Sequence, residues 1–502
     1  MRKQKPSKKS AASAGAMDPI IAPGSPKKFR ARIRMYRQGL GDCLLVTFPR
    51  GKASPFHILI DCGVLARDKD FMTGIVGHIR DTVREGRTIG KARLDVVVGT
   101  HEHKDHLSGF NQARTMFNED FDFGSVWLAW TENLTKPEVK KLKETKKRAL
   151  GMLKEALTSD RAAAAPEVLA GIGDLLAFSQ DDDTTGSGRV ADAMEYLKLR
   201  GKEAGDLRFL EPGADPFRLD GVDGVRVFVL GPPRDPAMLK TSAVTEQMKR
   251  DQVIYHLAHT GEAGVNALSA ALSSASAKDG DRFHPFTIEH RIPIKMPDPL
   301  KPTASKPNPY FSCIQKFVSK TYDNPLMAWR RVDHDWLTSI GQLALDLDND
   351  TNNTSLVLAF EVEATRDVLL FVADAQVGSW LSFGKLHFKV PERQQLLPAQ
   401  ELLGRTAFYK VGHHCSHNAT LRNGGLELMD RDDLVAFIPL DQATARKQGV
   451  KGWHMPAAPL FKALKAKTNG RVVLSDITEK VPVEAEKAGV CSTPTYIDYF
   501  LL

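Results

Sequence analysis

Short apolar runs bounded by turn residues occur near both ends of the chain. In the N-terminal part, "ARIRMYRQGLGDCLLVTF" alternates and then becomes apolar, and "FHILIDCG" and "RLDVVVGT" are compact apolar runs. The C-terminal part has the same texture in "NNTSLVLAFEVEATRDVLLFVADAQ", "TAFYKVGHHCSHNAT", "LVAFIPL" and "GRVVLSD". Apolar runs of roughly four to eight residues that end at turn residues are typical of buried strands. We therefore predict strands at both ends of the chain, beginning near Phe29.

The middle of the chain has a different pattern. "LTKPEVKKLKETKKRALGMLKEALTSD" has helical spacing of Leu and Ala with Lys on the other face, and "APEVLAGIGDLLAF" continues it. "FGSVWLAWTEN" and "GVRVFVLGPP" predict further strands, whereas residues 235–345 are again mostly helical around the Pro-rich "PIKMPDPLKPTASKPNP". The pattern predicts one α/β domain over residues 29–502, with helical insertions at about 133–220 and 235–345.

Composition and charge restrict the function classes. The chain has 502 residues and a net charge of +8, but residues 1–28 hold seven Lys or Arg against one Asp and so carry +6, which leaves +2 for the rest. We expect residues 1–28 to be a disordered basic tail. Five scattered cysteines without a CxxC spacing indicate neither disulfides nor a thiolate zinc site. With no signal peptide or apolar span, we expect a cytoplasmic protein with no membrane partner.

The segment "THEHKDHLSGF" concentrates candidate chemistry directly after a predicted strand. His101 and His103 are two residues apart, which differs from the four-residue spacing of helical zinc motifs, so we expect all six residues on a loop at the strand's carboxyl end. Neutral imidazoles and a carboxylate are ligands that Zn²⁺, Mn²⁺ and Fe favour. Two histidines for one metal and an Asp-His pair for a second would use the whole motif.

This motif resembles the HxHxDH signature of the metallo-β-lactamase superfamily, whose fold is a four-layered αββα sandwich. "GLGDCLLVTF" with "ILIDCG" is similar to the strands that precede the signature there, most closely in the hydrolase domain of DNA-internalisation competence proteins. "NNTSLVLAFE" with "DVLLFVADAQ", and "KVGHHCSHNAT", resemble later elements of that subgroup. The resemblance covers roughly residues 30–130, 222–232 and 350–475. It implies an α/β four-layered αββα metallo-β-lactamase sandwich with helical insertions.

The resemblance also implies a ligand set for two divalent metal ions, with Zn first and Mn or Fe as alternatives. His101 and His103 would bind the first metal, Asp105 and His106 the second, and Asp374 would bridge them. One of His413 and His414 would complete the second site, and the sequence leaves both open. Asp61 and Asp42 would support the metal-binding loop from behind, since outer carboxylates fix imidazole tautomers.

Two features depart from the family pattern. A third histidine for the first metal is absent from "FVLGPPRD", where the superfamily often supplies it, and the histidines of the insertions are possible substitutes: His256, His259, His284, His290 and His334. Cys415 stands where glycine is usual, and its thiol could approach the metals or simply be buried.

A paired metal centre would activate water for hydrolysis. Asp105 could then accept a proton from the attacking water, and His417 and His454 are candidates for the general acid. The first hypothesis for the function is a phosphodiesterase acting on a nucleic acid or nucleotide. The alternatives are a hydrolase of a small ester, thioester or amide, and a metal-stabilised interaction module without catalysis. The Lys-rich helix at 135–155 is interpreted as a solvated face, and the sequence does not indicate an oligomeric state.

Overall fold

The computed structural model describes residues 18–51, 53–85, 90–158, 189–240, 335–448 and 452–502, with a few positions between 313 and 321. In the described residues most strands form two sheets. The first has eight strands in the order β16 (Val490–Ser492), β17 (Tyr496–Leu501), β1 (Ala31–Tyr36), β2 (Cys43–Arg50), β3 (Ala53–Cys62), β4 (Ala92–Gly99), β5 (Phe121–Ala129) and β6 (Leu207–Leu210).

The second sheet is built mainly from the C-terminal part of the chain. Within the described residues it has seven strands, in the order β15 (Val472–Leu474), β14 (Val435–Ile438), β13 (Thr406–Lys410), β10 (Asp367–Phe371), β9 (Val357–Val362), β8 (Val225–Gly231) and β7 (Phe217–Arg218). Both sheets are mixed. A separate small pair consists of β11 (His387–Phe388) and β12 (Leu397–Pro398).

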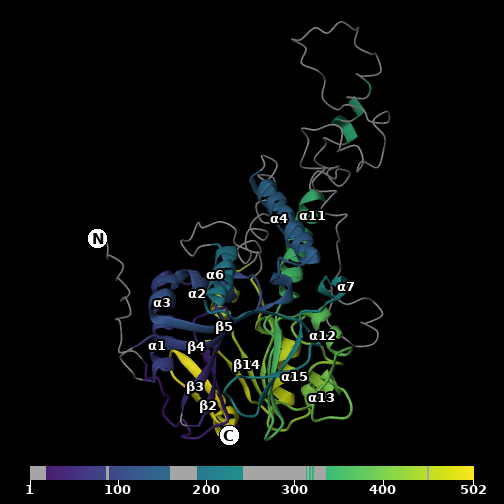
Figure 1. Ribbon diagram of the computed structural model, residues 1–502. Coiled ribbons are helices and arrows are strands. Elements are labelled where there is room, and N and C mark those ends of the chain that lie inside the picture. The colour runs from purple at the N-terminus through teal and green to yellow at the C-terminus, as the bar shows by residue number, and fades with distance from the viewer. Residues whose placement is uncertain are drawn as a thin grey trace, which may run out of the picture.

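Three buried apolar clusters arrange these elements in four layers (Figure 1). The central cluster joins the inner faces of the two sheets, for example Ile58 and Val96 with Phe360 and Phe437. A second cluster covers the outer face of the first sheet with α1 (Lys69–Arg84), α2 (Lys104–Gln112), α3 (Arg114–Asp120) and α6 (Val190–Glu203). A third covers the outer face of the second sheet with α12 (Val377–Phe383), α13 (Ala399–Gly404), α14 (Gln442–Ala445) and α15 (Ala458–Lys467).

The strands predicted at both ends of the chain are confirmed, and they form two packed sheets flanked by helices. The chain ends also meet, because β17 lies between β16 and β1 in the first sheet. Residues 18–28, assigned above to the tail, contact this body: Thr495 donates its backbone N–H to the Asp18 carboxylate (2.7 Å), and Ala22 is buried. Residues 1–17 lie outside the described residues.

Two long helices stand beside each other at one end of the sandwich (Figure 1). They are α4 (Pro137–Thr158), in the first predicted insertion, and α11 (Asp335–Asn352), which begins within the end of the second, and they pack against each other. The first insertion also contributes α6 and β6 to the sandwich itself, since Val190, Met194 and Leu197 belong to an outer core cluster. The remaining short helices are α7 (Pro236–Leu239) and α16 (Val483–Lys487). Among the described residues, no helix combines the length and apolarity needed to cross a bilayer.

Candidate metal centre

The predicted site residues follow strands of both sheets that end at one edge of the sandwich. β3 and β4 are parallel neighbours in the first sheet, and β10 and β13 are parallel neighbours in the second. A backbone hydrogen bond from Leu356 to Thr100 (3.0 Å) ties the two sheets together at this edge. Segments that are about 300 residues apart in the chain therefore meet where carboxyl ends of strands lie together, the usual place for sites in α/β folds.

The HxHxDH segment divides between a loop and a helix. Thr100 to His103 form the loop after β4, whereas α2 begins at Lys104, so Asp105 and His106 lie in its first turn. The expectation that all six residues lie on a loop was wrong for Lys104, Asp105 and His106. The His103 carbonyl accepts hydrogen bonds from the N–H groups of His106 and Leu107 (3.2 and 3.0 Å), which starts the helix. An acidic residue is also favoured in a first helical turn.

Two glycines allow the neighbouring chain to approach this turn. A Cβ atom on Gly63 would lie 2.4 Å from the backbone nitrogen of His106, and one on Gly41 would lie 2.4 Å from the carbonyl oxygen of Asp105. Gly41 also has a φ of +145°, which other residues rarely adopt. These glycines explain the "GLGD" and "IDCG" segments: they let the chain carrying Asp42 and Asp61 pack directly on the first turn of α2.

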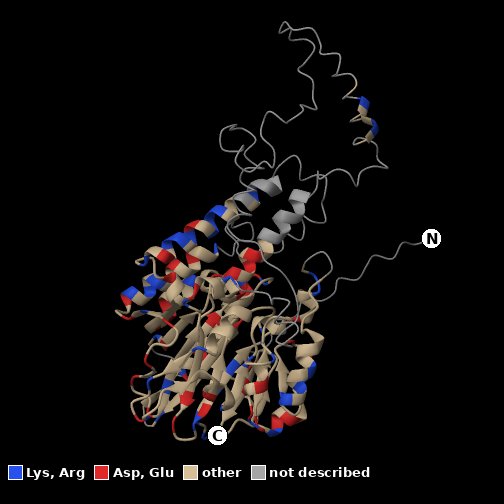
Figure 2. Cartoon of the chain, turned by 90° about the vertical axis from the view of Figure 1, so that its right-hand side faces the viewer, with Lys and Arg blue, Asp and Glu red and all other residues tan. Residues whose placement is uncertain are grey.

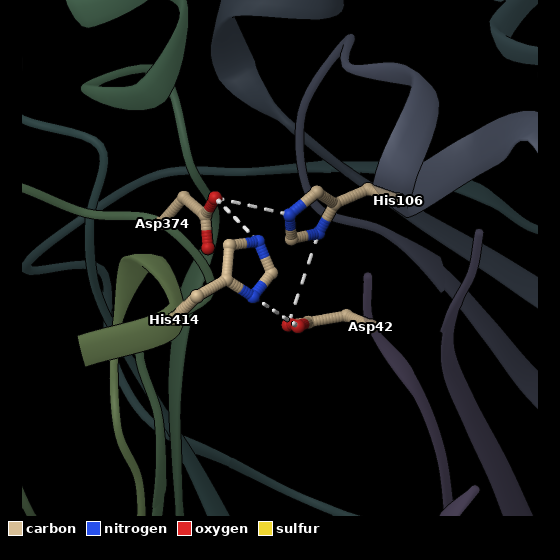
Figure 3. Close-up of side chains that lie close together, drawn as sticks. All are labelled: Asp42, His106, Asp374 and His414. Carbon is tan, nitrogen blue, oxygen red and sulfur yellow. Dashed lines mark ion pairs between the residues drawn. The ribbon is translucent and has the colours of Figure 1, made fainter. Parts of the chain in front are cut away.

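Four buried side chains form a group that could hold a metal ion (Figure 3). Asp42, His106, Asp374 and His414 each offer a ligand atom, and these atoms lie within 4.8 Å of one another. Asp42 precedes β2, His106 lies in α2, Asp374 follows β10 and His414 follows β13. The group thus brings three candidate metal ligands, His106, Asp374 and His414, together with Asp42, which was expected only to support them.

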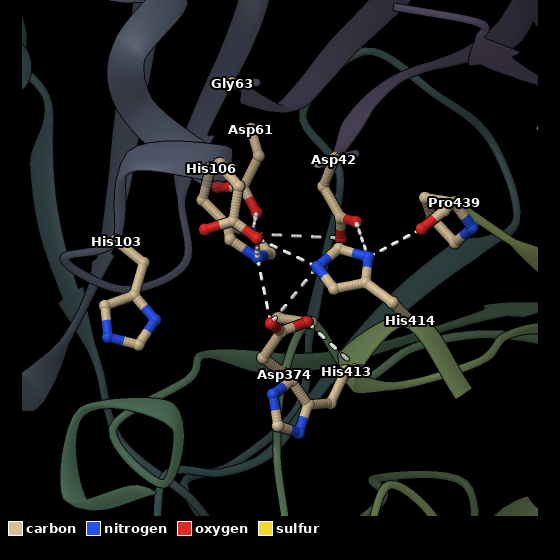
Figure 4. A network of polar contacts seen from close by, with 12 residues as sticks. Asp42, Asp61, Gly63, His103, His106, Asp374, His413, His414 and Pro439 are labelled. Carbon is tan, nitrogen blue, oxygen red and sulfur yellow. Dashed lines mark hydrogen bonds and ion pairs between the residues drawn. The ribbon is translucent and has the colours of Figure 1, made fainter. Parts of the chain in front are cut away.

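Hydrogen bonds to the outer nitrogens fix how the two imidazoles face the centre. Nδ1 of His106 donates to Oδ2 of Asp61 (2.7 Å), and Nδ1 of His414 donates to the Pro439 carbonyl (2.6 Å) (Figure 4). Both Nε2 atoms therefore point inward. Nε2 of His106 lies 3.2 Å from Oδ2 of Asp374, and Nε2 of His414 lies 2.8 Å from Oδ2 of Asp105. Nε2 is then the nitrogen that each ring offers to a cation.

Asp42 occupies the opposite side of these rings. Its carboxylate lies 3.8 Å from Nδ1 of His106 and 4.0 Å from Nδ1 of His414, nitrogens that already donate elsewhere. It is also ion-paired with the buried ammonium of Lys410, which donates to the Ala373 carbonyl (2.8 Å) and lies 3.6 Å from Oδ1 of Asp374. Asp105 is therefore the better candidate for the carboxylate that completes the set with His106, His414 and Asp374.

The residues present fit a divalent cation of the zinc class. Nε2 of His106 and Oδ1 of Asp105 are buried and make no hydrogen bond within the described residues. Buried polar atoms of this kind call for a partner. Imidazole nitrogens and carboxylate oxygens are the donors that Zn²⁺, Mn²⁺ and Fe²⁺ accept. A cation in this position would take the place of the ring protons that now face Asp105 and Asp374.

The electrostatics of the cluster favour positive charge. Burial lowers the pKa of His106, but Asp374, Asp105, Asp42 and Asp61 outweigh it and raise the pKa well above its usual range. The pKa of His414 is likewise raised, against burial, by Asp374 and Asp105. Burial raises the pKa of Asp374, yet His106 and His414 bring it well below normal. Carboxylates held in this way keep their negative charge for a cation.

His101 and His103 form a second pair beside the cluster. Nε2 of His101 lies 3.2 Å from Nδ1 of His103, and the His101 and His106 ring centroids are 4.2 Å apart. Burial lowers the pKa of His103 to about 3, and burial together with His106 and His103 lowers that of His101 far below normal. Both rings are therefore neutral, the form that binds metal.

The structure separates the two histidines that the sequence left open. His414 lies in the cluster, whereas the His413 ring contacts polar side chains outside it: Nδ1 lies 2.7 Å from Oγ of Ser416 and 3.3 Å from Oδ1 of Asn418. Only the backbone N–H of His413 donates to Asp374 (3.1 Å) (Figure 4). Both residues have positive φ, and this tight turn directs successive side chains to different places.

The remaining candidates lie away from the cluster. Cys415 is buried in the apolar core beyond the second sheet, and burial raises the pKa of its thiol to about 12, so it is a neutral core residue. His417 and His454 are exposed, and no hydrogen bond or ion pair between described residues joins them to the cluster. The possible third-ligand histidines lie outside the described residues: His256, His259, His284, His290 and His334.

Two residues near the centre were missed by the sequence reasoning. Lys410 ends the apolar strand "TAFYK", and a single Lys at a strand end carries no signal of burial. Asp348 lies on α11, where Oδ1 is 3.7 Å from Nε2 of His103, but the surrounding "LDLDND" reads only as an acidic helix face. Both depend on contacts between distant segments.

Comparison of the chain with protein-family models, with curated proteins and with solved structures finds no match in any of the three. The structure is that of an α/β protein with two mixed sheets flanked by helices. At the edge where the sheets meet, it has a buried His/Asp group that could hold a metal ion.

Proposed function

We propose that the chain is a metal-dependent hydrolase of the metallo-β-lactamase superfamily that cleaves phosphodiesters in nucleic acids or nucleotides. The observation that carries this proposal is the convergence of His106, His414, Asp374 and Asp105 at the meeting edge of two sheets. They derive from the three motifs that resemble that superfamily, in the same chain order. Structure alone fixes no substrate, so the substrate class rests on separate arguments.

The proposed ligand set divides between two cations. His101 and His103 would hold the first, and Asp105, His106 and His414 would hold the second. Oδ2 of Asp374 lies 3.2 Å from Nε2 of His106 and 3.6 Å from Nε2 of His414, so Asp374 would contribute a carboxylate beside the second set. Two divalent cations would supply a lowered pKa for a shared water molecule and polarisation of a substrate oxygen.

The side chains of the protein itself have distinct tasks in this proposal. Asp61 and the Pro439 carbonyl hold the rings of His106 and His414 in their inward orientation. Lys410 neutralises Asp42 and holds the turn at Asp374 through the Ala373 carbonyl. Asp105 retains one oxygen, Oδ1, without a hydrogen bond among the described residues, and this oxygen accepts the proton of the attacking water.

The basic residues of α4, in the first insertion, favour a phosphate-bearing substrate for the proposed hydrolase (Figure 2). On its inner side, α4 directs Lys143 and Lys146 to the carboxylate of Glu102, each at 3.0 Å, and Glu102 lies between His101 and His103 in sequence. Its outer side exposes basic residues at helical spacing: Lys140, Lys141, Lys147 and Arg148. A basic helix attached to the metal-binding loop can hold a polyanionic strand beside the centre.

The experiment compares hydrolysis of bis-p-nitrophenyl phosphate and of p-nitrophenyl acetate by the full chain with added Zn²⁺ or Mn²⁺. We expect phosphodiesterase activity that falls at least 100-fold in Asp374→Asn. Asp367→Asn is the matched control, because Asp367 is also buried and lies on β10 but pairs with Arg431 away from the centre (2.6 Å). Phosphodiesterase activity that survives Asp374→Asn would refute the metal mechanism. Activity on the acetate alone would indicate an ester hydrolase, and activity on neither would indicate an interaction module.

A further inference from the structure

The ring of His101 is fixed by a chain of hydrogen bonds behind it. The Thr100 hydroxyl donates to Oδ2 of Asp61 (2.7 Å), so it can only accept from Nδ1 of His101 (3.0 Å). Nδ1 of His101 therefore carries the ring proton, and its Nε2 offers a lone pair toward Nδ1 of His103. A cation bound by this pair needs Nδ1 of His103 to be free of a proton as well.

The other nitrogen of His103 faces a residue of α11. Oδ1 of Asp348 lies 3.7 Å from Nε2 of His103, whose side chain is 1% exposed, against 13% for that of Asp348. Oδ2 of Asp348 accepts a hydrogen bond from Nδ2 of Asn352, one helical turn further on (3.2 Å). One carboxylate oxygen is thus held within the helix while the other is directed at the histidine.

We propose that Asp348 is a positioning residue for the first metal: its carboxylate keeps the proton of His103 on Nε2 and so leaves Nδ1 to bind the cation together with Nε2 of His101. The inference rests on the proposed function, because it requires that His101 and His103 bind metal. Metal-binding histidines commonly direct their second nitrogen to a carboxylate, which fixes both the tautomer and the ring. Asp61 has this role for His106, and Asp348 supplies it for His103.

The position of Asp348 in the chain gives the proposal a structural consequence. The sandwich supplies the support for His106 from β3, but the support for His103 comes from α11, a helix that begins within the end of the second insertion. Asn352, which holds Asp348, also has Nδ2 at 3.4 Å from Nε2 of His413. The end of α11 is therefore placed against both metal-binding turns, so the occupancy of the first site depends on how α11 is docked.

The test measures Zn²⁺ binding by the full chain after it has been stripped with chelator, by competition with a chromophoric chelator, and records Co²⁺ absorption bands. We expect two bound ions in the wild type. Asp348→Ala should lower the affinity of one site 10- to 100-fold and alter one set of Co²⁺ bands, while the other site is unchanged. Asp348→Asn should recover part of the affinity, because its amide oxygen can face Nε2 of His103 in place of the carboxylate oxygen. Asp350→Asn is the control on the same helix, since its charged neighbours are Lys240 and Asp346.

A double-mutant cycle separates positioning from a general effect on folding. If Asp348 acts through His103, then Asp348→Ala should cause no further loss of affinity in a His103→Ala background. Wild-type affinity at both sites in Asp348→Ala, or an equal loss at both, would overturn the inference and leave the proposed function standing. A wild-type chain that binds no metal would overturn both. If Asp348→Ala does not fold, Asp348→Asn, which preserves the size of the side chain, decides the matter by the same criteria.

Discussion

The carboxylate of Asp61 accepts a 2.7 Å hydrogen bond from Nδ1 of His106 and is completely buried. The same carboxylate accepts from the backbone N–H and the hydroxyl of Thr100 (2.9 and 2.7 Å), which precedes the first histidine of the loop. One side chain therefore holds both ends of the HxHxDH segment.

Asp61→Asn should reduce metal affinity by about 10- to 100-fold, because the amide is a poorer acceptor for the ring N–H of His106. Asn tolerates the positive φ of 55° at this position, so the fold should be retained. Metal competition assays measure the affinity, and circular dichroism melting curves check that the fold is retained. Unchanged metal affinity would show that Asp61 does not orient His106.

Single substitutions of the adjacent histidines should have unequal effects. His414→Ala removes a ring whose Nε2 lies 2.8 Å from Oδ2 of Asp105, and we expect the metal content and the phosphodiesterase rate to fall about 100-fold or more. His413→Ala removes contacts with Ser416 and Asn418 and should cost less than about tenfold. Metal content and steady-state kinetics on both variants provide the comparison. Equal losses would contradict the assignment of His414.

Gly63→Ala should destabilise the protein by about 2–4 kcal/mol, since the new Cβ would lie 2.4 Å from the backbone of Asp105 and His106 and would force the loop away. Gly74→Ala is the control: Gly74 is an exposed position of α1 with nothing within 4 Å of a new Cβ, and Ala there should stabilise the helix by about 0.5–1 kcal/mol. Urea unfolding of both variants measures the difference. A Gly63→Ala protein as stable as the wild type would mean that the close approach is absent.

Asp350 should make stability depend on pH. Burial, opposed by Lys240 and reinforced by Asp346, raises its pKa to about 7 from an ordinary value of 3.8. The folded state therefore binds a proton more tightly than the unfolded state, so stability from this group is present at low pH and is lost as pH rises from about 4 to 7. Asp350→Asn should match the wild type at pH 4 and exceed it at pH 8 by on the order of 1–3 kcal/mol. Urea unfolding at both pH values tests this, and an equal difference at pH 4 and 8 would exclude the titration of Asp350 as its cause.

Charge reversal on α4 tests the proposed phosphate-binding surface. Lys140→Glu with Lys147→Glu should weaken binding of single-stranded DNA by the metal-free chain and reduce the slope of log affinity against log salt by about one to two. Lys462→Glu with Lys465→Glu is the matched control, because these exposed residues lie on α15, in the helix layer that covers the outer face of the second sheet. Electrophoretic mobility shifts at several salt concentrations measure both. Equal losses in the two variants would indicate attraction by net charge alone.

Much of this arrangement could be predicted from local signals. The buried strands follow from apolar runs, and the clustered histidines follow from a motif six residues long, because both kinds of signal lie within a few neighbouring positions. Helix α1 was missed although its N-cap Asp68 and its apolar face were readable, and β17 was missed although "TYIDYFLL" begins by alternating.

The remainder depends on contacts between distant segments. Whether His413 or His414 turns inward is decided by the positive-φ backbone conformations of this turn, which the sequence pattern does not reveal. The burial of Lys410 is decided by Asp42, a residue more than 300 positions away. The role of Asp348 depends on how α11 packs against the sandwich. The hydrophobic periodicity of the sequence does not predict that packing.

The division of the candidate ligands between the first and last parts of the chain has a consequence for biosynthesis. A chain that has been translated only as far as β6 holds His101, His103 and His106, but neither Asp374 nor His414 exists yet. The four-residue group therefore cannot assemble until both parts of the chain have been synthesised. If the group holds a metal ion, as proposed, tight binding would follow the synthesis of His414.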